Sequence, residues 1–149
     1  MKTGTGLAVI DLNISSHLYN FIDYFKTFMQ YKIHQSGTLK LTELISDKVE
    51  IQDVQSALDV MANAGYQGAE KLLIKKENII EAFFDLKTGL AGEILQKFSN
   101  YNMQLAIIGD FSGYSSKSLR DFIYESNKKG QILFIKSIEE AIAYWDKKY

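Results

Sequence analysis

Short apolar segments alternate with helical patterns along the second half of the chain, and this alternation constrains the fold more than any other feature. The apolar segments lie at residues 72–74, 105–109 (LAIIG) and 132–135. Each has the length of a strand, and after each one apolar side chains recur at the spacing of an amphipathic helix. Strands that are separated by helices pair in parallel. The pattern therefore predicts an α/β fold with a mainly parallel sheet of four or five strands.

A β-hairpin is expected before this alternation. Apolar and polar residues alternate around Tyr31 and Ile33 and again around Leu39 and Leu41, and residues 35–38 between them have turn chemistry. Period-two alternation on both sides of a short turn is typical of a hairpin. A further short strand is predicted at residues 49–51.

Capping residues and glycines predict the helix ends. Asp53 would cap a helix that ends at Gly65, with an aromatic contact from the next residue. Asn78 and the glutamate three residues later have the spacing of a capping box, so Asn78 is expected to open a helical turn. Gly89 and Gly92 lie early in the next helical segment, where we expect them to permit a close backbone approach.

Residues 1–28 differ from the rest of the chain. After two serines that could cap a helix, apolar and mainly aromatic side chains recur at helical spacing. They are Leu18, Phe21, Ile22, Phe25 and Phe28. We therefore expect an extension with an amphipathic helix at 1–28 and a single α/β domain at 29–149. The aromatic face could pack on the domain or form a homodimer with a second copy, or the extension could precede a true start at Met29.

Composition excludes several kinds of partner and site. The 149 residues hold 17 Lys and Arg, 18 Asp and Glu, and no cysteine. This balance argues against nucleic acid or an anionic membrane as the partner. No stretch approaches the ~18 apolar residues that span a bilayer, so we expect a cytoplasmic protein. The two histidines and the scattered carboxylates lack metal-ligand spacing, and nucleotide-binding glycine motifs are absent, so we expect neither a metal nor a cofactor.

The sharpest candidate site follows residues 105–109. Ligands of parallel sheets bind beyond the carboxyl ends of the strands, and Asp110 lies directly after this one. The small and hydroxyl-bearing residues that follow are Ser112, Gly113, Ser115 and Ser116. They could present backbone N–H groups to an anion, with Ser115 or Ser116 capping the next helix. An ordinary capped connection would explain the same residues.

Arg120 is the one arginine beside sixteen lysines. The abundance of Lys, Ile, Asn, Tyr and Phe indicates a bias toward AT-rich codons, under which an arginine is kept for its planar fork or remains by chance. We expect Arg120 to face Asp110 or Asp85. It would form either a structural arginine–carboxylate pair or a clamp for an anionic ligand.

A second candidate surface lies at Asp85, Lys87 and Thr88. A carboxylate, an ammonium group and a hydroxyl stand together before a helix. This combination would suit a phosphate or a contact with a partner protein. Helix capping by Asp85, with Lys87 in solvent, is the alternative.

Three long segments carry a resemblance to a known family. They are DVQSALDVMANAGYQGA from Asp53, FFDLKTGLAGEILQKFSNY from Phe83 and LAIIGDFSGYSSKSLRDFIYESNKKGQI from Leu105. From Met29 to its C-terminus the chain resembles a small, uncharacterised bacterial family, domain of unknown function 4180. Because that family has no assigned activity, the resemblance implies no catalytic residues.

The order of elements also resembles, more distantly, the STAS domains of anti-sigma factor antagonists. In those domains a hydroxyl residue at a helix start is phosphorylated, and the matching segment here is 87–90, with Thr88 as the hydroxyl residue. The resemblance implies a STAS-like fold and a phosphorylation site at Thr88. Lys87 stands where the family pattern has a serine, and Asp85 is displaced from its expected position.

These observations favour a regulatory module that is not an enzyme and that binds a protein partner or a small anionic ligand. The alternative is a small enzyme that acts on an anionic metabolite. In that case Asp110 would be the base and Arg120 the anion clamp.

Overall fold

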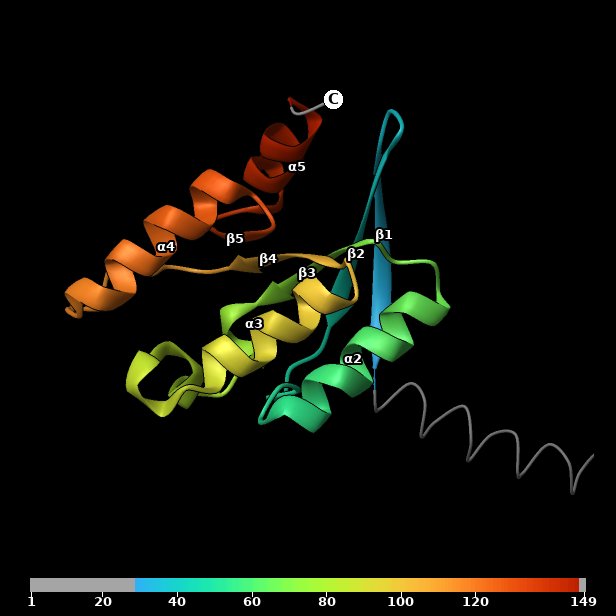
Figure 1. The fold of residues 1–149 in the computed structure, drawn as a ribbon. Coiled ribbons are helices and arrows are strands. Elements are labelled where there is room, and N and C mark those ends of the chain that lie inside the picture. Colours follow the sequence, from blue (N-terminus) through green and yellow to red (C-terminus); the bar gives the residue numbers. More distant parts are fainter. Residues whose placement is uncertain (1–28, 148–149) are drawn as a thin grey trace, which may run out of the picture. The chain divides into compact units, whose positions relative to one another are not determined.

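Each strand of the sheet lies beside its neighbour in sequence. The computed structural model describes residues 29–147, and the order in its five-stranded sheet is β1-β2-β3-β4-β5 (Figure 1). The strands are β1 (Gln30–Ser36), β2 (Leu39–Ile45), β3 (Lys71–Lys75), β4 (Gln104–Ile108) and β5 (Ile132–Ile135). Strands β2 to β5 pair in parallel, which confirms the predicted mainly parallel α/β fold. The aromatic positions expected in the extension at 1–28 lie outside the described residues.

The predicted hairpin is formed by β1 and β2. Only Gly37 and Thr38 separate the two strands, and a two-residue connection joins antiparallel neighbours. Gly37 has a φ of 58°, a left-handed conformation that suits glycine. The strand predicted at 49–51 is wrong. Only Ile51 forms a bridge there, to Ile79, because the chain turns past this point into a helix.

Three helices cover one face of the sheet. They are α2 (Val54–Tyr66), α3 (Leu90–Asn100) and α4 (Lys117–Lys129), each of which connects two neighbouring parallel strands. Right-handed connections that all step in one direction place their helices on the same side. Accordingly α2 lies beside α3 (Figure 1), and α3 and α4 share a groove lined by Leu95 and Phe122.

The last helix, α5 (Ile138–Asp146), covers the opposite face. Its buried residues Ala141 and Trp145 pack against one residue or more from each of β2 to β5. These strand residues are Leu39, Leu41, Leu73, Ala106 and Leu133. Trp145 is fully buried, and its indole N–H donates to the carbonyl oxygen of Gly130 at 3.1 Å. One helix therefore shields the whole apolar stripe on this side.

The outer edge of β5 is closed by a side chain of α4. The backbone N–H of Phe134 donates to Asn127 Oδ1 at 2.8 Å, and Asn127 Nδ2 donates to the Phe134 carbonyl oxygen at 3.0 Å. A carboxamide thus makes the two bonds that a residue of a sixth strand would make. It satisfies backbone groups that would otherwise be open to another chain.

Most of the predicted helix caps form. Asp53 accepts from the backbone N–H of Ser56 at 2.8 Å, and Ser56 completes a capping box. The predicted end at Gly65 is wrong by one residue, because α2 continues through Tyr66 and the chain turns at Gly68, whose φ is 85°. The expected aromatic contact is also wrong, since Tyr66 is 94% exposed.

Three 3₁₀ turns follow β3, and Asn78 does not cap them. The turns are η1 (Lys76–Asn78), η2 (Glu81–Phe84) and η3 (Leu86–Thr88). Asn78 is buried, and its amide donates to the carbonyl oxygens of Ser46 and Lys48 at 2.9 and 2.8 Å. This long-range contact pins the loop after β2, so the capping box expected at Asn78 is wrong.

The two glycines near the start of α3 permit no close backbone approach. A Cβ at Gly89 or at Gly92 would meet nothing within 4 Å, so the expected role is wrong. Gly89 has a φ of 75° and ends η3, which explains a glycine there by its left-handed backbone.

Candidate functional site

The structure joins the two candidate surfaces at the carboxyl edge of the sheet through three aromatic rings. The ring of Phe84, from η2, lies 5.5 Å from that of Tyr114 and 6.0 Å from that of Phe111. Phe111 also meets Phe134 of β5 edge-on at 5.4 Å. Aromatic pairs at these separations stabilise a fold beyond their buried area. The 3₁₀ turns and the loop after β4 are therefore fixed to one another and to the sheet.

Tyr114 makes a second connection between these segments. Its hydroxyl donates to Glu81 Oε1 at 2.9 Å. Burial raises the pKa of Tyr114 above its ordinary value, and the hydrogen bond and negative charge of Glu81 raise it further. Tyr114 therefore stays protonated and keeps donating across the physiological pH range.

Lys76 lies over the same loop. Its ammonium group is 4.6 Å from the centre of the Tyr114 ring and 3.3 Å from the Asp110 carbonyl oxygen. Its stem passes so close to Gly109 that a Cβ there would lie 2.7 Å from Lys76 Cβ. Glycine is thus required at position 109 to let Lys76 reach its partners.

Asp110 forms a local turn. Its Oδ1 accepts from the backbone N–H of Ser112 at 2.9 Å, and the side chain is exposed. Hydrogen bonds from Ser112 hold the pKa of Asp110 below its ordinary value, with smaller contributions from Lys136 and Lys76. A carboxylate with a lowered pKa is a weak base, and these contacts fit the capped connection better than a catalytic role.

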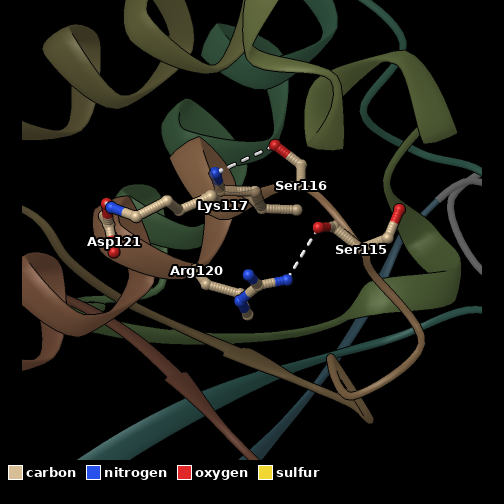
Figure 2. Close-up of polar contacts among 6 residues, drawn as sticks. Ser115, Ser116, Lys117, Arg120 and Asp121 are labelled. Carbon is tan, nitrogen blue, oxygen red and sulfur yellow. Dashed lines mark hydrogen bonds and ion pairs between the residues drawn. The ribbon is translucent and has the colours of Figure 1, made fainter.

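Arg120 does not reach a carboxylate. Its Nη1 donates to the Ser115 carbonyl oxygen at 2.7 Å, and within residues 29–147 no carboxylate lies at ion-pair distance from it (Figure 2). The pairing expected with Asp110 or Asp85 is wrong. Side chains on a helix lean toward its N-terminus, and that direction brings the guanidinium to the backbone of the preceding loop.

The serines before α4 behave as a cap and a loop. Ser116 Oγ accepts from the backbone N–H of Leu119 at 3.2 Å, which confirms Ser116 as the N-cap (Figure 2). Ser112, Gly113 and Ser115 are exposed. Ser112 already gives its N–H to Asp110, so that group is not open to an anion.

Thr88 holds the last 3₁₀ turn together. Its exposed hydroxyl lies 2.9 Å from the Ala82 carbonyl oxygen and 2.8 Å from that of Asp85, and it accepts from the N–H of Leu90 at 3.2 Å. Asp85 accepts from the N–H of Lys87 at 3.2 Å, as the capping alternative expects. The Lys87 side chain is exposed.

One known protein family matches most of this chain. The model of the family described as Domain of unknown function (DUF4180) matches residues 36–144. The chain belongs to the DUF4180 family. No curated protein and no solved structure matches it significantly.

In this DUF4180 domain the site residues that sequence reasoning missed are the aromatic ones. No motif or spacing in the sequence distinguishes Phe84, Phe111 and Tyr114 from aromatic residues that pack in a core. The available signal was their position, because Phe84 precedes Asp85 directly and the other two lie within the loop after Asp110. In residues 29–147 no group of three acids or histidines could hold a metal ion, and no helix is long and apolar enough to cross a membrane.

Proposed function

We propose that this DUF4180 domain is a regulatory module that binds a protein partner through its loop edge, defined as residues 76–88 and 110–116. The observation that carries the proposal is the aromatic contact of Phe84 with Phe111 and Tyr114. It holds two loops in one arrangement while charged side chains beside it remain exposed. A surface that is ordered before binding loses less entropy when a partner docks.

The charges of the loop edge favour a protein over a small anion. The exposed side chains of Glu81, Asp85 and Asp110 are acidic and that of Lys87 is basic. A phosphate or carboxylate ligand would need the backbone N–H of Ser112, but that group already donates to the Asp110 carboxylate. The negative charge of Asp110 would also repel such a ligand. A protein surface can match both signs of charge at once.

The enzyme alternative needs Asp110 and Arg120 around one substrate. Each side chain instead bonds to the backbone of the loop between β4 and α4. Asp110 accepts from the Ser112 N–H, and Arg120 donates to the Ser115 carbonyl oxygen. The geometry therefore supports binding better than it supports this catalytic pair.

Phosphorylation of Thr88 would regulate binding at the loop edge. The resemblance to anti-sigma factor antagonists implies phosphorylation at this position, and the side chain is exposed. A phosphate would remove the proton that the hydroxyl offers to the Ala82 and Asp85 carbonyl oxygens. Modification would then open the turn as well as add charge beside Lys87.

The proposal is tested by placing a photocrosslinking amino acid at Lys87 and, as a control, at Lys40. Both side chains are exposed, but Lys40 lies near the amino ends of the parallel strands, opposite the loop edge. We expect a specific protein adduct in the native host from position 87 and none from position 40. The purified partner should then bind Lys87→Glu at least about tenfold more weakly, a difference of roughly 1.4 kcal/mol. Identical adducts from both positions would contradict the proposal.

A further inference from the structure

A second surface lies between α2 and the residues that follow α3, and it includes no residue of the loop edge. A groove of about 520 Å³ is lined by Leu58, Met61 and Gly65 of α2 and by Tyr101 and Met103, which follow α3. It runs from Gln55 to Gly65, roughly 15 Å at the rise of an α-helix. The α2 residues that line the groove therefore span about three helical turns.

The outer face of α2 carries very little charge. Of its thirteen residues only Asp59 is charged, whereas α4, of the same length, carries six charged residues. A helix that faces only water normally presents charged side chains on its outer stripe. Tyr101, which lines the groove, is 67% exposed, and Tyr66, which follows Gly65 in the chain, is 94% exposed. Tyrosine is enriched where proteins meet.

Small residues and one carboxylate indicate what the groove would hold. Ala62 is exposed, and a Cβ at Gly65 would meet only the end of Met103 at 3.8 Å. No large side chain of α2 therefore blocks the groove at these two positions. Asp59 Oδ1 accepts from Gln55 Nε2 at 3.1 Å, and within residues 29–147 Asp59 forms no ion pair. An apolar groove with a single acid is complementary to a helix whose apolar face carries a single cation.

We propose that this groove binds an amphipathic helix of a partner protein, with the apolar face of that helix against Leu58, Met61 and Met103 and a lysine or arginine opposite Asp59. Because Ala62 has a small side chain and Gly65 has none, the backbone of the partner helix can approach that of α2. The groove lies on α2, so it is independent of the loop edge and of the function proposed for it. Helix-in-groove recognition uses contacts of this kind, with anchors three, four and seven residues apart.

The test uses two synthetic helical peptides of roughly 14 residues, or four turns. Both carry a leucine stripe, and they differ only in a central lysine or glutamate. Full-length protein labelled at its methionine methyl groups is titrated with each peptide and followed by NMR. We expect the lysine peptide to shift the Met61 and Met103 signals and to bind about fivefold more tightly than the glutamate peptide.

Three variants make the experiment decisive. Asp59→Lys should reverse the preference so that the glutamate peptide binds more tightly. Glu125→Lys, an exposed acid in the middle of α4, should leave the preference unchanged. Ala62→Arg, at an exposed position, should block both peptides without unfolding the protein. Circular dichroism of each variant confirms that it is folded.

Several outcomes would overturn the proposal. They include equal binding of the two peptides, methyl signals that neither peptide shifts, and a preference that survives Asp59→Lys. Shifts that depend on protein concentration without peptide would assign the groove to a second copy of the chain. Shifts caused by phenethylamine but not by the lysine peptide would assign it to small amines.

Discussion

At the residue scale, the side chains of this domain either bond to backbone a few residues away or reach segments that are distant in the sequence. Asp53 and Ser116 cap their helices as expected, because each cap needs only an N–H group three residues away. Asn78 and Arg120 differ from expectation for the opposite reason. The partners of Asn78 lie about thirty residues upstream, and Arg120 had two possible carboxylates that only the folded chain could exclude.

Arg120→Lys should be nearly neutral for stability. The arginine is exposed and its hydrogen bond goes to a carbonyl oxygen, which an ammonium group can also reach. We expect the free energy of unfolding in urea to change by less than about 0.5 kcal/mol. A loss of several kcal/mol would show that the fork of the guanidinium is needed after all.

Asp53→Asn should flatten the acid side of the stability profile. Hydrogen bonds from the backbone and hydroxyl of Ser56 hold the pKa of Asp53 below its ordinary value of 3.8. The lowered pKa contributes stability above the unfolded value, and this contribution is lost as pH falls through the folded value. Asparagine caps comparably at every pH. Urea midpoints at about pH 6 and about pH 3 should therefore differ less in the variant than in the wild type. An equal difference would contradict the assignment.

At the scale of elements, periodicity predicted the regular structure and missed the irregular connections. The continuous apolar run at 105–109 predicted a strand, and residues 105–107 of β4 are buried between the two helical layers. The 3₁₀ turns after β3 have no comparable signature, because packing of Phe84 on the loop after β4 shapes them. Both halves of the candidate site were thus predicted, but the aromatic contact that joins them was not.

Asn127→Ala should destabilise the edge of the sheet. It removes both side-chain bonds to Phe134 and leaves a part-buried N–H and carbonyl without a partner. We expect a loss of about 1–3 kcal/mol in the free energy of unfolding. Asn100→Ala is the control, since Asn100 is exposed at the end of α3 and, among residues 29–147, its side chain accepts from Gln96 alone. Equal losses in the two variants would show that Asn127 does not secure the edge.

At the scale of the whole molecule, the family match falls inside one compact unit of the chain. The DUF4180 model covers residues 36–144, and among the described residues, 31–147 belong to one compact unit. Every described strand except the first residue of β1 falls within that unit.

A chain that begins at Met29 should therefore fold cooperatively. The hairpin and all later elements are retained in it. Differential scanning calorimetry should show one thermal transition, with a calorimetric enthalpy equal to the van't Hoff enthalpy. Loss of that transition would show that Phe21, Phe25 and Phe28 complete the core.

The strand order has a consequence for synthesis on the ribosome. Because each strand pairs with its neighbour in sequence, the sheet can grow one strand at a time as the chain emerges. The face opposite α2, α3 and α4 is covered later, since α5 follows all five strands in the sequence and leaves the exit tunnel after them. Until then Leu41, Leu73 and Leu133 form an uncovered apolar stripe. A nascent chain that stalls before α5 would thus expose this apolar stripe to chaperones that bind unfolded chains.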